Sequence, residues 1–215
     1  RLLPESCMSD LVYYFRIQRC SGVYDRADRS VGFFGDPARP RVDVHGGWYD
    51  ASGDVSKYIG SLADTNYMDP QQSPMSVWVF LQSVEMLRAQ RSGRLRSLIP
   101  LLTEEAVYGG DFVMRMQDPS GYFYMSVFDG CTHDPAKREI AGYKGLDHRK
   151  HGDIQSSFRE GGGLAVAALA RLAALRTGGD YTPAQYLAAA EKGFTHLQTN
   201  SVRYCDDRRE NIIDD

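Results

Sequence analysis

Asp50 and Asp54 are the residues in this sequence whose type and spacing are best suited to chemistry. Both lie in the stretch "GGWYDASGD", residues 46–54, with no lysine or arginine between them to neutralise either carboxylate. Two interpretations are open. Asp and Gly are common in turns for their backbone geometry, and a loop can also hold two carboxylates because it needs them reactive.

The reactive interpretation has a specific form. Two aspartates on one loop can share a water molecule, one removing a proton while the other orients the oxygen for attack. The glycines of the stretch would let the backbone turn tightly and come close to a ligand. The ring of Trp48 is expected to wall the loop or to stack on a sugar.

Composition excludes several classes of protein. The chain has 215 residues, 42% hydrophobic and 25% charged, and a net charge of −3, so nucleic acid is not an expected partner. No apolar run reaches the roughly 18 residues of a membrane span. The N-terminus resembles neither a signal peptide nor a natural start, so an upstream segment is expected to have been removed.

The four cysteines do not form a metal-binding pattern. They are Cys7, Cys20, Cys131 and Cys205, and no CxxC pair occurs. A zinc site is therefore not expected, and the thiols are predicted to be reduced and mostly buried.

Helical periodicity dominates the chain and predicts an all-α fold. Apolar residues recur three and four positions apart, with Ser, Thr and Pro at the starts, in five segments. They are residues 6–20, 73–90, 98–116, 161–177 and 183–199. No alternating run is long enough for a sheet core, although "GYFYMSVF", residues 121–128, could form a short ribbon.

Two long stretches without helical periodicity, roughly 21–60 and 117–157, interrupt the helices. Loops of that length usually serve a function, and the second contains His133, His148 and His151. If both lie on one side of the helical scaffold, they would form a polar cleft rimmed by aromatic rings. Such a cleft suits sugars, whereas the alternative is solvated loops with unrelated aromatic residues.

The stretch "GGWYDASGDVSKY" resembles the "GGWxDAGDxxKF" signature of glycoside hydrolase family 9, which includes many endoglucanases. The order of the flanking helices is also similar over most of the chain. The resemblance implies an (α/α)6 toroid of six helical hairpins. Residues 1–215 would be the N-terminal part of one catalytic domain, about half of the barrel.

The family resemblance also implies an activity and its setting. The expected reaction is the hydrolysis of β-linked glucans, or related plant and bacterial glycans, with inversion of configuration. No cofactor is expected, although a structural calcium ion is compatible with the family. The implied partners are a polysaccharide or oligosaccharide substrate and an N-terminal immunoglobulin-like domain, in a secreted or periplasmic protein.

Residue by residue, the resemblance assigns Asp54 as the general base and Asp50 as the residue that helps to hold the attacking water. Lys57 and Tyr58 match the "KF" of the signature. The sequence departs from the family by one extra residue in "DASGD" and by Val55 where histidine is common. Its extra residue could mark a subgroup with another substrate.

Three further side chains join Trp48 as substrate-binding candidates. Tyr58 follows the aspartates directly, and His151 and Arg159 border the second long stretch, where they could bind sugar hydroxyls. Asp129, in "FDG", either faces the cleft or makes a turn.

No residue is nominated as the general acid. In the family this is a glutamate in the last part of the barrel, which is expected beyond Asp215. Among the local glutamates, Glu104 and Glu105 are predicted to lie on an exposed helix face. Glu139 is predicted to be solvated, and Glu160 to sit at the entrance of a helix, where a carboxylate favours the dipole.

Two rival functions remain open. "DDRRE", with Asp206, Asp207 and Glu210, has the spacing of a carboxylate cluster that holds magnesium on one helix face, but no second such helix accompanies it. Alternatively, the protein is a degenerate, non-catalytic relative of the family that binds polysaccharide. The two retained aspartates argue against that alternative, because binding alone does not need two carboxylates.

Overall fold

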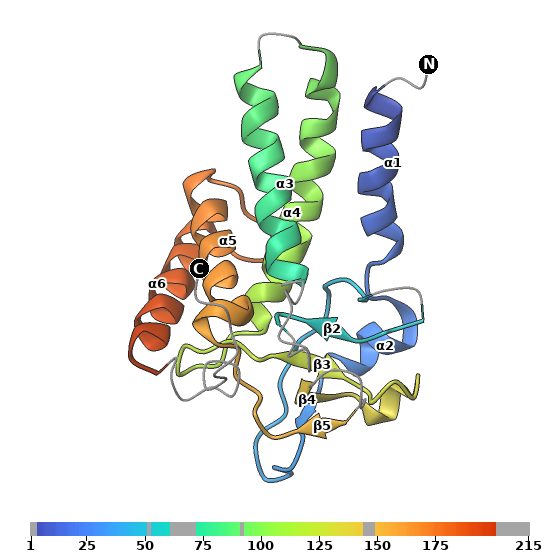
Figure 1. Ribbon diagram of the computed structural model, residues 1–215, viewed down its shortest axis with the longest axis vertical. Coiled ribbons are helices and arrows are strands. Elements are labelled where there is room, and N and C mark those ends of the chain that lie inside the picture. Colours follow the sequence, from blue (N-terminus) through green and yellow to red (C-terminus); the bar gives the residue numbers. More distant parts are fainter. Residues whose placement is uncertain (1–3, 51–52, 61–71, 91–92, 144–148, 201–215) are drawn as a thin grey trace.

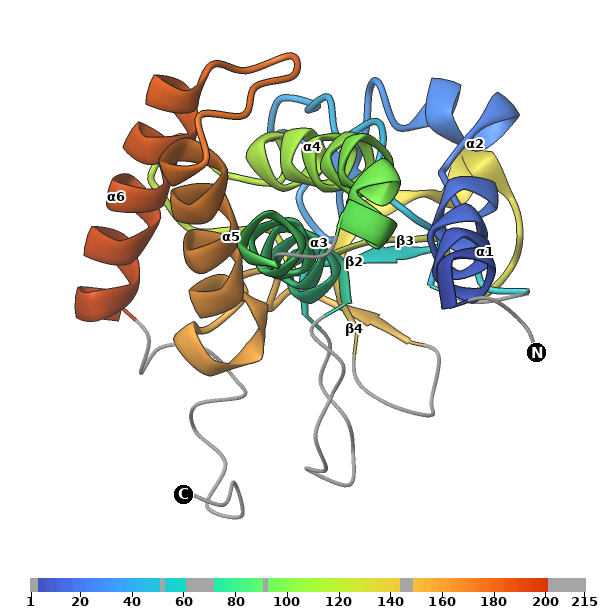
Figure 2. The same ribbon diagram turned by 90° about the horizontal axis from the view of Figure 1, so that it is seen from above.

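A long helical hairpin forms the centre of the molecule. The structure is a computed structural model that describes residues 4–50, 53–60, 72–90, 93–143 and 149–200. The hairpin consists of α3 (Gln72–Ala89) and α4 (Ile99–Arg115), and the 3-10 helix η1 (Gly93–Leu98) leads directly into α4. Helix α1 lies on one side of it, and α5 and α6 lie on the other (Figures 1 and 2).

All five predicted helices are present, with ends shifted by a few residues. Besides α3 and α4 they are α1 (Pro4–Ile17), α5 (Gly163–Ala174) and α6 (Pro183–Asn200). Helix α6 begins as its Thr-Pro sequence predicts. The Thr182 backbone N–H donates to Gln185 Oε1 at 2.8 Å and Gln185 N donates back to Thr182 Oγ1 at 3.3 Å, a capping box. Within the described segments, no helix has the length and apolarity that a membrane crossing requires.

The expectation of an all-α fold without a sheet core needs correction, although a strand does form within the ribbon expected at 121–128. Five short strands form one sheet in the order β1–β4–β3–β2, with β5 also paired to β4. The strands are β1 (Gly32–Phe33), β2 (Lys57–Tyr58), β3 (Ser126–Phe128), β4 (Glu139–Tyr143) and β5 (Lys150–His151). None exceeds five residues, which is too short for alternation to stand out in the sequence.

The sheet joins the two long stretches between the helices. Strands β1 and β2 come from the first stretch and β3 to β5 from the second. The first stretch also contains the short helix α2 (Gly22–Ala27), and the second contains the 3-10 helix η2 (Pro135–Lys137). All of these lie at one end of the α3–α4 hairpin (Figure 1). Both stretches therefore lie at one end of this hairpin, which is the condition on which the expected cleft depended.

The two faces of the sheet have different surroundings. Val127 and Ile140, opposite one another on β3 and β4, belong to the main hydrophobic core with the helices. Tyr58, Phe128 and Ala141 form a second, smaller buried cluster. Because side chains alternate along a strand, the register places these three on the other face of the sheet.

The cysteines that the structure describes are free thiols, as predicted, but only one of them is buried. Cys20 is buried, Cys131 is partly buried and Cys7 is exposed on α1. Cys20 lies beyond the end of α1, not within it as the periodicity predicted. Cys205 lies outside the described residues.

Candidate active site

The loop that carries Asp50 and Asp54 is held against α1 and α4. We call residues 46–56 the aspartate loop. The Gly47 carbonyl accepts a hydrogen bond from Cys20 N at 2.8 Å. Gly47 has φ +76°, and a Cβ there would lie 2.7 Å from the Phe112 ring of α4. Glycine is therefore required for both backbone conformation and space.

The two aspartates converge on Ser56. Asp54, which is half-buried, accepts a hydrogen bond from Ser56 N at 2.8 Å through Oδ1. Its Oδ2 accepts a hydrogen bond from the Tyr58 hydroxyl at 3.2 Å. Asp50 is exposed, and its backbone N donates to the Ser56 carbonyl at 3.0 Å. The carboxyl group of Asp54 is thus oriented through both oxygens, whereas Asp50 is tied to Ser56 through its backbone.

Asp129 adds a third carboxylate to this cluster. It is 1% exposed, and its Oδ1 accepts hydrogen bonds from Cys131 N at 3.0 Å and from Ser56 Oγ at 3.5 Å. Its Oδ2 has no hydrogen-bond partner among the described residues. Burial raises the pKa of the Cys131 thiol, and the charges of the surrounding aspartates raise it further. These are, in order, Asp54, Asp129 and Asp50, so all three lie near the thiol.

A buried group of three charges lies beneath the aspartate loop. Asp28 pairs with Lys57 at 2.7 Å and with the Arg138 guanidinium at 2.6 and 2.8 Å. Burial alone would raise the pKa of Asp28, but these two cations outweigh it and hold the pKa below its usual value. The neighbouring Cys20 thiol is mainly desolvated, which raises its pKa to about 11. We call Asp28, Lys57 and Arg138 the buried triad.

Trp48 lies in the hydrophobic core. It is 5% exposed and contacts the rings of Phe15, Phe80 and Tyr108 edge-on. Its indole Nε1 donates to Glu105 Oε2 at 3.3 Å. Tyr58, the other aromatic candidate, is 2% exposed and directed at Asp54. Burial leaves neither ring a free face for a sugar, so neither is placed to stack on substrate in this structure.

His151 and Arg159 come from other elements. His151 lies on β5 opposite Gly142, and a Cβ at Gly142 would lie 2.4 Å from its ring. Arg159 lies on the π-helix η4 (Phe158–Gly162), which leads into α5. A Cβ at Gly161 would lie 2.2 Å from the Ile59 carbonyl, so η4 packs against the chain just after β2. The π-helix η4, which carries Arg159, thus lies next to the end of β2, the strand that follows the aspartate loop.

The glutamates differ from the prediction at one position. Glu105 was expected on an exposed face, but its side chain is fully buried because Arg19 pairs with it at 2.6 Å and Trp48 donates to it. Glu104 is exposed, as predicted. Glu139 lies on β4 and pairs with Lys150 at 2.7 Å. The side chain of Glu160 lies outside the described part of the chain.

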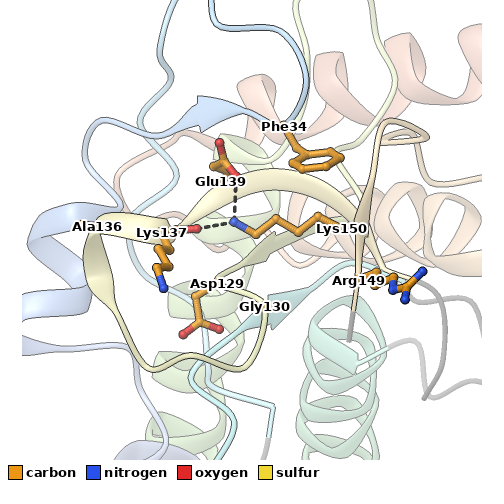
Figure 3. A pocket seen from close by; sticks show the side chains of 8 residues that line it. All are labelled: Phe34, Asp129, Gly130, Ala136, Lys137, Glu139, Arg149 and Lys150. Carbon is orange, nitrogen blue, oxygen red and sulfur yellow. Dashed lines mark hydrogen bonds and ion pairs between the residues drawn. The ribbon is translucent and has the colours of Figure 1, made fainter. Parts of the chain in front are cut away.

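An open hollow of about 610 Å³ adjoins Asp129. Phe34, which is 37% exposed, Arg149 and the Lys150–Glu139 pair contribute to its lining. The Asp129 carboxylate points away from the Lys150–Glu139 pair (Figure 3). The hollow therefore offers an aromatic ring and charged groups next to the aspartates, in the size range of ligand pockets.

Sequence reasoning missed two members of the buried triad. Lys57 was noticed through the family signature, whereas Asp28 and Arg138 carried no local signal. They are 110 positions apart, so only the fold brings them together. In the described segments, no group of three or more His, Cys, Asp or Glu side chains is arranged to hold a metal ion. The carboxylate run at 206–210 lies outside those segments.

Comparison with known proteins gives the following matches. The sequence model of glycosyl hydrolase family 9 matches residues 5–213. The solved structure of GH family 9 endoglucanase J30 is 20% identical with a TM-score of 0.60, and a Zn-binding triple mutant of it is 21% identical with a TM-score of 0.59. Both alignments cover 91% of this chain and 38% of the other.

A metagenome-derived glycoside hydrolase family 9 endoglucanase is also similar, at 21% identity and a TM-score of 0.57. That alignment covers 88% of this chain and 36% of the other. The chain therefore has the fold of these endoglucanases over most of its length and spans less than two fifths of theirs. Among curated proteins, none matches the chain significantly.

Proposed function

The chain belongs to glycosyl hydrolase family 9, and on that premise we propose that the protein containing it hydrolyses β-linked glucans or related glycans. The observation that carries the proposal is the orientation of the Asp54 carboxylate through both oxygens, with the charge of Asp50 close enough that both act on the Cys131 thiol. A turn alone would not require a second aspartate beside the first or a tyrosine hydroxyl to orient it.

Asp54 acts as the general base in this proposal. Ser56 N and the Tyr58 hydroxyl each take one lone pair of its carboxylate, which leaves a further acceptor site on each oxygen for water. The exposed Asp50 helps to hold that water. Inversion requires a carboxylic acid about 6.5–9.5 Å away on the other side of the scissile bond. We expect this acid to be a glutamate outside the described residues.

We further propose that residues 1–215 are the N-terminal part of one (α/α)6 domain, about half of the barrel. Large apolar side chains are exposed on the helices, including Leu11 at 67% and Ile17 at 61% on α1 and Met86 at 56% on α3. Exposed apolar helix faces of this kind usually pack against other elements. Further hairpins of the barrel would cover them.

The experiment compares the full-length protein with Asp54→Asn and Asp50→Asn by the release of reducing sugar from β-glucans and xyloglucan. Asp54→Asn is expected to lower kcat by about 10²–10⁴-fold, because the amide cannot accept the proton. Asp50→Asn is expected to have a smaller effect. Asp43→Asn is the matched control, because Asp43 is an exposed aspartate near the loop whose carboxylate bonds to His45 within the described residues.

Each outcome decides one part of the proposal. If Asp54→Asn and Asp50→Asn both match the wild type, the loop is only a turn and the assignment is wrong. If the wild type binds glycan without cleaving it, the protein is a non-catalytic relative. Where cleavage occurs, proton NMR of the first product anomer decides between inversion and retention.

A further inference from the structure

The buried triad contains one more cation than its carboxylate needs. Lys57 is fully buried and directs its ammonium to Asp28 and to the carbonyls of Val44 and Gly46, each at 2.7 Å. This single cation already compensates Asp28. Arg138, 3% exposed, adds a second positive charge to the same buried space.

The charges of Asp28 and of the buried Asp129 both act on Arg138, and a buried guanidinium also needs a hydrogen bond for the N–H groups that its ion pair leaves over. Arg138 makes such a bond. Its Nη1 donates to the Val55 carbonyl at 2.7 Å, while Nε and Nη2 hold the two oxygens of Asp28. Since Lys57 holds Val44 and Gly46, the two cations bind the chain at both ends of the aspartate loop.

The bond to Val55 has a direct consequence for Asp54. The Val55 carbonyl and the Ser56 N–H belong to one peptide group, which is planar. Arg138 binds the oxygen of this plane, and the N–H on its other side donates to Asp54 Oδ1 at 2.8 Å. The guanidinium is itself fixed by its two hydrogen bonds to Asp28. It therefore sets the orientation of the Val55–Ser56 peptide, which in turn orients the Asp54 carboxylate.

We propose that Arg138 is a positioning residue for the candidate base Asp54 and acts through the Val55–Ser56 peptide. This inference rests on the proposed function. It predicts that Arg138 contributes to turnover more than to substrate binding, because the guanidinium is buried and hydrogen-bonds the loop backbone.

Arg138→Lys tests the proposal in the full-length protein. A lysine keeps the charge, but a point-charge ammonium cannot hold both oxygens of Asp28 and the Val55 carbonyl in one fixed plane. The variant is expected to fold, because Lys57 still compensates Asp28. We expect kcat to fall by about tenfold or more while KM stays within about twofold, since small misplacements of a reacting group are costly.

Arg39→Lys is the matched control. Arg39 also holds a carboxylate, that of Asp118, and its guanidinium lies 3.8 Å from the centre of the Phe33 ring. Among the described residues Arg39 hydrogen-bonds to Asp118 and Tyr122 and not to the aspartate loop, so loss of its guanidinium should lower stability and leave kcat within about twofold. Melting temperatures of both variants separate the two effects.

Three results would overturn the proposal. If Arg138→Lys keeps the wild-type kcat while Asp54→Asn is inactive, Arg138 does not position the base, although the proposed function stands. If the kcat losses of Arg138→Lys and Arg39→Lys follow their losses of melting temperature, the effect is only one of stability. If KM rises and kcat does not change, Arg138 acts on binding.

The test remains decisive if Arg138→Lys does not fold. Arg138→Gln is then used, because it leaves the neutral Asp28–Lys57 pair and an amide of limited reach. It should show the same loss of kcat at constant KM. Should Asp54→Asn itself be as active as the wild type, the proposed function fails first.

Discussion

Two buried aspartates, one beneath the aspartate loop and one between α4 and α6, show how differently two regions of the molecule are built. Asp28 lies beneath the sheet and the aspartate loop, between Lys57 and Arg138. Asp111 lies on α4 at the contact with α6, where it accepts hydrogen bonds from the Tyr186 hydroxyl and from Asp180 N. The first has two cationic partners, and the second is bonded mainly to neutral donors.

The surroundings move the two pKa values in opposite directions. The cations hold the pKa of Asp28 low despite its burial. Burial raises the pKa of Asp111, and the hydrogen bonds from Asp180 and Tyr186 offset this only in part. Beneath the aspartate loop the charged Asp28 holds two cations that bind loop carbonyls, whereas at the α4–α6 contact a carboxyl group joins two helices. Burial alone therefore does not indicate a functional site.

The largest expected effect that distinguishes the regions is that of Asp28→Asn. This change leaves Lys57 and Arg138 buried together without a counter-charge, which should cost about 3–5 kcal/mol of unfolding free energy. Asp111→Asn, at the α4–α6 contact, should cost about 1 kcal/mol, because the amide oxygen can still accept from Tyr186. Urea unfolding measures both, and equal losses would contradict the contrast.

A second pair of variants removes one hydroxyl from each region. Tyr58→Phe removes the donor to Asp54 and should lower kcat by about tenfold, equivalent to roughly 1.4 kcal/mol of activation free energy. Tyr186→Phe removes the donor to Asp111 and should cost about 1–3 kcal/mol of stability while leaving kcat unchanged. Steady-state kinetics and thermal melts of both proteins decide, and a loss of kcat in Tyr186→Phe would remove the distinction.

The smallest expected effect is on the pH dependence of stability. Because the folded pKa of Asp28 is lowered, its contribution is present above the unfolded pKa of about 3.9 and is lost as pH falls below it. The folded pKa of Asp111 is raised, so its contribution is present below pH 3.9 and is lost as pH rises through the folded value.

Asp111→Asn tests the expected loss of stability at Asp111 as pH rises. It should flatten the stability curve just above pH 4 by about 1 kcal/mol or less and leave the acid limb below pH 4 in place. Urea midpoints between pH 3 and 7 provide the measurement. An unchanged curve above pH 4 would show that Asp111 does not titrate as inferred.

Local signals in the sequence correctly predict the helices. Apolar spacing of three and four places α3, α4, α5 and α6 within a few residues of their positions, and the Thr-Pro start of α6 is confirmed by its capping box. These signals act over one or two turns of helix, so they can be read from neighbouring residues. The sheet was missed because its strands are short and pair across distant segments.

In the candidate site, too, local features were predicted from the sequence and features that depend on distant contacts were not. Asp50 and Asp54 were identified from the sequence, since the motif that carries them is contiguous. The burial of Trp48 and Glu105 was not, because each is removed from solvent by partners on other elements. Trp48 packs against α3 and α4, and Glu105 pairs with Arg19 beyond the end of α1.

The sequence by itself determined the helical segments and the two aspartates with their glycines, because hydrophobic periodicity and turn chemistry are local properties. Only the tertiary structure decided what those aspartates face. It brought Asp129 and Arg138 from the second long stretch to the Ser56 peptide of the first. Contacts between such distant positions depend on the closure of the sheet, and no spacing along the chain records them.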